Sequence, residues 1–225
     1  MFGTHSMSHI KCEFAQVGMA CARCGEDGFV EGTTVRMESD WRNVAWLVEG
    51  DMVFTFENGL QPVRQITVID IWKQPGTCPS SVCPLFVPSG ALGNEEDLVL
   101  QGETMVALAS KAFEKQNGSR FALLQGADLI GFIGIELFQP DVPAKLYQLH
   151  FDQEELVPVA NGAIACCPSI LSALSLDASG DRESIEATTT GIPKLDHMQA
   201  KAFLAHLEQE LVETLNARAE TKSAS

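Results

Sequence analysis

Histidine is scarce in this sequence, and none occurs between His9 and His150. The middle of the chain therefore has no imidazole for general acid–base catalysis. The chain also lacks a Gly-x-Ser-x-Gly turn, a P-loop, an HExxH motif and a GxGxxG stretch that opens a helix. The sequence therefore carries none of the common motifs of serine hydrolases, nucleotide-binding proteins or zinc proteases. We expect no cofactor.

Positive charge is also sparse, because 15 Lys and Arg residues stand against 30 Asp and Glu residues, for a net charge of -15. Such a surface repels phosphate backbones and anionic head groups, so we expect neither nucleic-acid nor membrane partners. No apolar run reaches the roughly 18 residues that span a bilayer. The first residues show no basic end followed by an apolar core, which predicts no secretory signal and a cytoplasmic location. Non-classical export stays open.

The chain has 225 residues, of which 45% are hydrophobic. This is enough for one domain of about 150 residues with an extension. The seven cysteines are odd in number and follow no secretion signal, so we expect reduced thiols rather than a disulfide framework. They are Cys12, Cys21, Cys24, Cys78, Cys83, Cys166 and Cys167.

The most informative stretch is a predicted β-hairpin between Val48 and Ile66. A Gly50-Asp51 turn leads into an alternating strand at 52–56, and Asn58-Gly59 turns the chain back, because these residues tolerate positive φ. Other short strands with turn signals every ~8–12 residues predict an all-β domain. The expected strands are 33–37, 43–47, 51–56, 61–71, 85–87, 105–108, 145–151 and 156–159, the last two as a hairpin closed by Asn161-Gly162.

The C-terminal part has a different character and predicts a helical extension. A short helix is expected at 170–176, a polar linker at 177–190, and a long amphipathic helix from Lys194 to about Arg218. Its apolar stripe is Leu204, Leu207, Leu211 and Leu215, which must pack on the β domain or on a partner protein such as a second copy. The predicted segments are an irregular arm at 1–27, a β domain at 28–168, a helix and linker at 169–193, the long helix at 194–219 and a disordered tail at 220–225.

Several motifs in order resemble the Hint domain, the fold shared by inteins and the autoprocessing part of hedgehog proteins. The closest resemblance is to the bacterial stand-alone branch, and it covers roughly residues 28–168. It implies a flattened, horseshoe-like unit of short strands with internal pseudo-twofold symmetry. The stretches that carry it are 28–33 (GFVEGT), 43–55 (NVAWLVEGDMVFT), 59–66 (GLQPVRQI), 89–93 (SGALG), 97–99 (DLV), 127–131 (ADLIG) and 160–163 (ANGA).

The resemblance implies a self-cleavage reaction whose two main groups are replaced here. In the family, a Cys, Ser or Thr at the first residue attacks the preceding carbonyl, and a His in a Thr-x-x-His block protonates the leaving nitrogen. Matched residue by residue, Gly28 holds the nucleophile position and Thr104 holds the histidine position. Relatives also tend to carry a His in the last hairpin, where this chain has Gln148 and Glu154 or Glu155. We therefore expect a degenerate Hint domain that has lost autoproteolysis and serves as a non-catalytic binding or assembly module.

Two alternatives remain open from the sequence. Cys24 could act as a displaced thiol nucleophile, assisted by His150, which shares a strand face with Gln148. This would preserve self-cleavage. Alternatively, the N-terminal arm could hold zinc, although the spacing of its candidate ligands fits no standard pattern. Those ligands are His5, His9, Cys12, Cys21 and Cys24.

Overall fold

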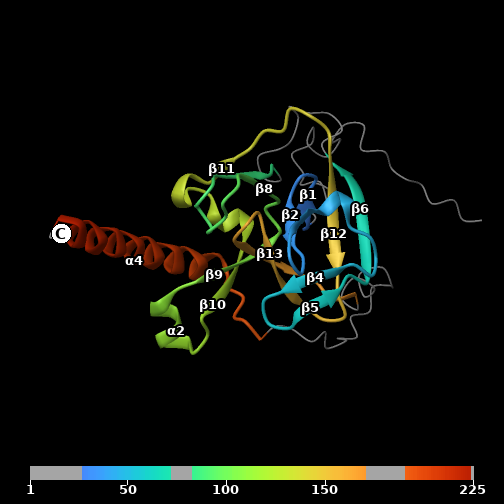
Figure 1. Cartoon of the computed structure of the whole chain (residues 1–225). Coiled ribbons are helices and arrows are strands. Elements are labelled where there is room, and N and C mark those ends of the chain that lie inside the picture. The colour runs from blue at the N-terminus through green and yellow to red at the C-terminus, as the bar shows by residue number, and fades with distance from the viewer. Residues whose placement is uncertain (1–26, 72–82, 171–190, 224–225) are drawn as a thin grey trace, which may run out of the picture.

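Antiparallel strands dominate the computed structural model, which describes residues 27–71, 83–170 and 191–223 (Figure 1). One six-stranded sheet has the order β11-β7-β8-β1-β12-β6, and a second has the order β10-β9-β14-β13-β2-β3. Strands β4 and β5 form a separate two-stranded sheet. The all-β prediction is confirmed. The strands are β1 Phe29–Val30, β2 Thr34–Arg36, β3 Trp41–Asn43, β4 Met52–Thr55, β5 Gly59–Pro62, β6 Gln65–Ile71, β7 Leu85–Val87, β8 Leu98–Leu100, β9 Met105–Ala109, β10 Phe121–Gln125, β11 Glu136–Leu137, β12 Ala144–His150, β13 Glu155–Val159 and β14 Ala163–Cys167.

The predicted hairpin is β4 and β5, with Thr55 opposite Gly59. Gly59 has φ 67°, in the left-handed region that the Asn-Gly turn was expected to use. The predicted strand 61–71 is instead two strands, because the chain leaves β5 after Pro62 and enters β6 at Gln65. Between them Val63 is fully buried, and Arg64 donates from its backbone nitrogen to the His150 carbonyl oxygen at 2.8 Å.

Two other strand predictions are wrong. Residues 44–46 form the 3-10 turn η1 (Val44–Trp46), because the Asn43 side chain accepts a hydrogen bond from Ala45 N at 2.9 Å and turns the chain. The expected hairpin of 145–151 with 156–159 does not form. Strand β12 pairs with β1 and β6 in one sheet, while β13 pairs with β14 in the other. The Asn161-Gly162 turn therefore joins β13 to β14, a strand that the sequence analysis did not identify.

One main hydrophobic cluster takes side chains from both six-stranded sheets. Phe29 and Leu149 enter it from the first sheet, and Val106 and Val157 from the second. Three short turns, η1, η2 (Gly126–Leu129) and η3 (Phe132–Gly134), also contribute, and Leu129 is fully buried. The two sheets therefore share one core, and their strand ends are held at fixed positions around it.

The helix α2 (Lys111–Asn117) was not predicted from the sequence. Its first turn is capped by Ser110, whose hydroxyl accepts from Phe113 N at 3.2 Å, and Gly118 ends it with φ 73°. The Glu210 carboxylate also accepts from Ser110 Oγ at 2.8 Å and from Ala112 N at 2.9 Å. This helix is thus tied at its start to the C-terminal helix.

The C-terminal helix α4 (His197–Ser223) begins three residues later than predicted. A reciprocal capping box sets its start: Asp196 Oδ1 accepts from Gln199 N at 2.9 Å, and Gln199 Oε1 accepts from Asp196 N at 3.0 Å. The helix continues to Ser223, so the predicted disordered tail is helical up to that residue. No helix in the described part of the chain is long and apolar enough to cross a membrane.

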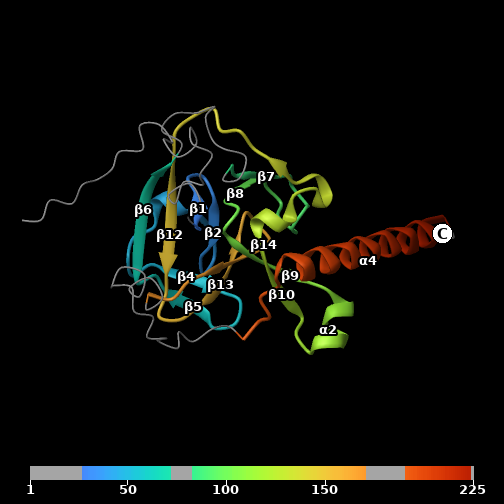
Figure 2. The same cartoon turned by 180° about the vertical axis from the view of Figure 1, so that it is seen from behind.

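Among the described side chains of α4, those that pack on the β domain lie in its first half. Ala200, Phe203 and Leu204 are buried, and Phe203 meets Phe113 of α2 edge to face, with ring centroids 5.3 Å apart. Leu207 is half-buried, but Leu211 is 39% exposed. Beyond that point the helix extends away from the sheets in both views (Figures 1 and 2). The side chain of Leu215 lies outside the described part. The same holds for the linker predicted at 177–190 and, apart from Ile170, for the short helix predicted at 170–176.

Candidate functional site

Gly28 lies immediately before β1, in the middle of the first sheet. Strand β1 is flanked by β12, with Phe29 opposite Tyr147, and by β8, with Phe29 opposite Leu100. Thr104 lies in the turn between β8 and β9, where its backbone nitrogen donates to the Gln101 carbonyl oxygen at 3.1 Å. The pairing of β1 with β8 brings this turn next to Gly28.

Thr104 contacts Gly28 through two hydrogen bonds. Gly28 N donates to Thr104 Oγ1 at 3.2 Å, and Thr104 Oγ1 donates to the Gly28 carbonyl oxygen at 3.1 Å. The hydroxyl is buried, with the residue 2% exposed. The two positions that the sequence analysis matched to a nucleophile and a histidine therefore lie in direct contact. A threonine hydroxyl does not titrate near neutral pH, so it cannot replace an imidazole as a general acid.

The backbone at Gly28 leaves no room for a side chain. Its φ is +132°, a conformation that L residues rarely adopt, and a Cβ atom would lie 2.9 Å from the Tyr147 carbonyl oxygen. That Cβ would also lie 3.2 Å from side-chain carbons of Gln148 and Leu146. The carbonyl is fixed by strand pairing and cannot move away cheaply. A cysteine or serine at this residue would therefore strain the sheet.

The carbonyl that precedes Gly28 is held by Gln148. Gln148 Nε2 donates to the Asp27 carbonyl oxygen at 3.1 Å and to Asp27 Oδ1 at 2.9 Å. The peptide bond between Asp27 and Gly28 therefore has a donor on its oxygen and an acceptor on its N–H. The bond is positioned and polarised, but residue 28 supplies nothing to attack it.

His150 lies two residues beyond Gln148 on β12 and is 4% exposed. Its Nε2 lies 3.4 Å from Thr67 Oγ1, and its Nδ1 is buried without a hydrogen-bond partner among the described residues. Burial lowers the pKa of His150, and the Asp27 carboxylate opposes this shift. Burial therefore favours the neutral imidazole, and no described contact links it to the Asp27–Gly28 bond.

Residues 27–166 match the profile of the Hint domain. The chain belongs to the Hint domain family. Comparison with solved structures finds a bacterial intein-like domain from Clostridium thermocellum, at 15% identity and a TM-score of 0.44, covering 62% of this chain and 98% of that one. A splice-inactive AceL NrdHF class 3 split intein matches at 10% identity and a TM-score of 0.43, covering 64% and 99%. No curated protein matches.

Gln101 is a buried polar residue beside Gly28 that the sequence analysis did not identify. It follows β8 and comes one position after the Phe29–Leu100 pair, opposite Gly28. It is 1% exposed, and neither Oε1 nor Nε2 has a hydrogen-bond partner in the described part of the chain. A glutamine that directly follows the apolar run Leu98-Val99-Leu100 was the available signal. We call Asp27, Gly28, Gln101, Thr104, Gln148 and His150 the Gly28 site.

The other candidate residues are placed elsewhere or lie outside the described part. Glu154 forms an ion pair with Lys194 at 2.6 Å, and Glu155 accepts from Asn58 Nδ2 at 3.0 Å, so both have structural contacts. Burial raises the pKa of the Cys166 and Cys167 thiols, which keeps them protonated and unreactive. The described residues contain no cluster that could hold a metal ion. The zinc candidates and the displaced nucleophile, His5, His9, Cys12, Cys21 and Cys24, all precede residue 27 and lie outside the described residues.

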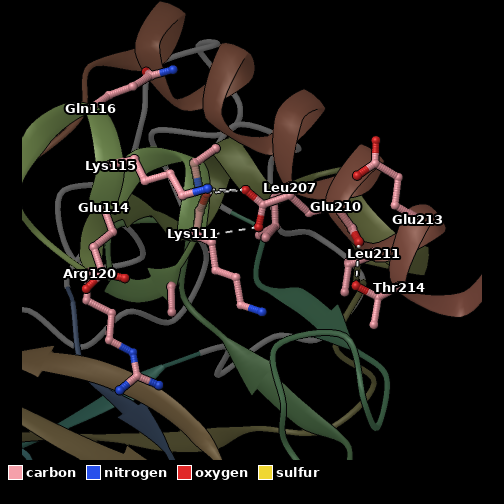
Figure 3. A pocket seen from close by; sticks show the side chains of 13 residues that line it. Lys111, Glu114, Lys115, Gln116, Arg120, Leu207, Glu210, Leu211, Glu213 and Thr214 are labelled. Carbon is pink, nitrogen blue, oxygen red and sulfur yellow. Dashed lines mark hydrogen bonds between the residues drawn. The ribbon is translucent and has the colours of Figure 1, made fainter. Parts of the chain in front are cut away.

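A surface pocket of about 960 Å³ lies between α2 and α4 and shares no residue with the Gly28 site. Figure 3 shows side chains of both helices around it, with Lys111 and Lys115 from α2 and Leu207 and Leu211 from α4. No histidine or cysteine lines it. Its lining combines charged groups with apolar ones.

Proposed function

We propose that this Hint domain is a pseudoenzyme that has lost the family's self-cleavage and acts as a non-catalytic binding or assembly module. The observation that carries the proposal is the backbone of Gly28. Self-cleavage by the family's route needs a side-chain nucleophile at this residue. Here the residue has no side chain, and the Tyr147 carbonyl oxygen occupies the space that a Cβ would need.

The replacement of the histidine supports the same proposal. Thr104 contacts both the N–H and the carbonyl of Gly28, so a hydroxyl lies beside the leaving nitrogen where the family has an imidazole as proton donor. Loss of one catalytic group commonly lowers the rate by several orders of magnitude. When two groups act together, restoring one of them does not restore the rate. A nucleophile restored alone would therefore give no useful activity.

The second half of α4 is the element best suited to a protein partner. Leu211 and Val212 are 39% and 56% exposed on a helix that extends beyond the β domain. An isolated helix is only marginally stable in water, so an unsupported half-helix gains from a second surface. The pocket between α2 and α4 adjoins Leu211 and adds Lys111, Lys115 and Arg120.

Intact-mass spectrometry tests the loss of self-cleavage. The wild-type chain and the double variant Gly28→Cys/Thr104→His are incubated at neutral pH with and without dithiothreitol. We expect one unchanged mass for the wild type and no thiol-dependent fragment from the double variant. Cys24→Ala serves as the control for a displaced thiol, since a fragment lost only in that variant would assign the cleavage to Cys24.

Light scattering after size exclusion tests the binding role of α4. Leu211→Asp and Val212→Asp should abolish self-association or binding of any partner recovered with the wild type. Met198→Asp is the matched control, because Met198 is 74% exposed in the first turn of the same helix. If the wild type is a monomer and neither variant alters any recovered interaction, α4 is not the partner-facing element.

A further inference from the structure

The contacts of Asp27 combine groups that the proposed binding function does not use. One donor atom, Gln148 Nε2, holds both the backbone carbonyl oxygen and the Oδ1 of this residue, at 3.1 Å and 2.9 Å. On the other side of the peptide bond, Gly28 N–H points at Thr104 Oγ1, 3.2 Å away. A carboxylate, a polarised carbonyl and a partnered leaving nitrogen are thus gathered at one peptide bond.

We propose that the fold promotes scission of the Asp27–Gly28 bond in mild acid, with the Asp27 carboxylate as the nucleophile. Its carboxylate oxygen forms a bond to the backbone carbonyl carbon of the same residue, which closes a five-membered ring. The C–N bond to Gly28 then breaks, and the nitrogen takes up a proton to become a new α-amino group. One water molecule opens the cyclic anhydride to two carboxyl groups, so the net reaction is hydrolysis with no other reactant.

Gln148 and Thr104 are placed to assist the two halves of this reaction. Gln148 Nε2 already donates to the carbonyl oxygen, and it can stabilise the negative charge that grows there when the ring closes. Thr104 Oγ1 accepts a hydrogen bond from the Gly28 nitrogen at 3.2 Å, and its hydroxyl can relay the proton that this nitrogen must gain. The intramolecular attack avoids the entropic cost of bringing in a second molecule.

The sequence singles out this aspartate. Asp27 is the only aspartate in the chain that is followed by glycine. The departing residue has no side chain beside the bond that breaks. The reaction also needs no side chain at residue 28, which distinguishes it from the route that the family uses and makes it independent of Cys24.

The reaction requires an ionised carboxylate and an available proton at the same time. For a carboxyl group this combination occurs in mild acid, at about pH 4–5. The other ionisable groups that respond to the Asp27 charge are His150 on β12 and Cys166 and Cys167 on β14. Both thiols are neutral under these conditions, so of these three groups only His150 can carry a positive charge near Asp27. At neutral pH the departing amine finds too few protons, and the chain stays whole.

The test is intact-mass spectrometry of the full-length protein over several days at about pH 4.5 and about pH 7.5, with circular dichroism to verify folding. We expect products 1–27 and 28–225, which together exceed the parent mass by one water, only in acid and without any thiol. Asp27→Ala should give no fragment. Gln148→Leu should slow the reaction by about 100-fold or more, the usual effect of removing one such donor. Gln153→Leu is the matched control, because Gln153 donates to Glu155 rather than to Asp27.

A urea-unfolded sample separates an effect of the fold from the general acid lability of aspartate. Scission that is faster in the folded chain and is lost in Asp27→Ala supports the proposal. Three results would overturn it: no fragment in acid, a fragment that does not begin at Gly28, or equal rates in folded and unfolded protein. A wild-type chain that stays intact at neutral pH still supports the loss of the family's reaction, so the two proposals can fail separately.

Discussion

Replacement of Gly28 by alanine is the substitution whose effect the structure defines best. The added Cβ lies 2.9 Å from the Tyr147 carbonyl oxygen, which the pairing of Phe29 with Tyr147 holds in place. A backbone conformation that is unfavourable for L residues costs about 1–3 kcal/mol, and overpacking costs a further 1–3 kcal/mol or so. The middle of these ranges gives about 4 kcal/mol. For a chain of this size, that lowers the Tm by about 8–16 °C.

Gly32→Ala is the matched control for this prediction. Gly32 also has a positive φ, +102°, but a Cβ there meets nothing within 4 Å. Gly32→Ala should therefore lower the free energy of unfolding only by the cost of the strained backbone, about 1–3 kcal/mol. Urea denaturation of both variants and the wild type gives the difference directly. If Gly28→Ala is as stable as Gly32→Ala to within about 0.5 kcal/mol, the Tyr147 carbonyl does not exclude a side chain, and the steric argument fails.

Three further predictions concern stability. Burial opposes ionisation of the Glu210 carboxyl, but hydrogen bonds from the start of α2 outweigh this effect and lower its pKa below 4.5. The ionised carboxylate therefore stabilises the folded state above pH 4.5, and this contribution is lost as the pH falls through the lowered pKa. Glu210→Gln should cost about 1 kcal/mol at neutral pH by urea denaturation and reduce that acid dependence; an unchanged midpoint would contradict this. Because burial lowers the pKa of His150 from 6.5, the unfolded chain binds its proton first, and stability should fall as pH drops below 6.5. His150→Gln should flatten that slope in thermal melts at several pH values, and an unaltered slope would mean that another group titrates. Leu204→Ala should cost about 2–5 kcal/mol because the side chain is buried, whereas Leu211→Ala should stay within about 0.5 kcal/mol; equal losses would show that the outer half of α4 also packs on the domain.

Local turn chemistry explains what the sequence predicted well. The hairpin of β4 and β5 depends on Asn58-Gly59, a turn signal within two adjacent residues. The long helix α4 was also predicted, but its start was placed three residues too early because the capping pair Asp196 and Gln199 was not recognised. The sequence analysis matched Gly28 and Thr104 to two positions of the family that the chain resembles, but it did not predict that they touch. The structure places Gly28 N 3.2 Å from Thr104 Oγ1, because β1 pairs with β8 and the turn after β8 lies beside Gly28.

Long-range pairing explains what the sequence did not predict. Nothing in the residues of β12 and β13 shows that they belong to different sheets, because alternation records which face is buried but not which strand lies beside it. For the same reason Gln101 escaped notice: its place opposite Gly28 depends on the register of β1 with β8. The steric block at Gly28 depends on Tyr147, more than a hundred residues away in the sequence.

The central claim is that the domain no longer cleaves itself by the family's route. The most direct measurement is the intact mass of freshly purified wild type at neutral pH, with and without excess dithiothreitol overnight. The account predicts one mass near 24.4 kDa under both conditions. A fragment that appears only with the thiol, such as one ending at Arg23, would show that Cys24 replaced the lost nucleophile and would contradict the account.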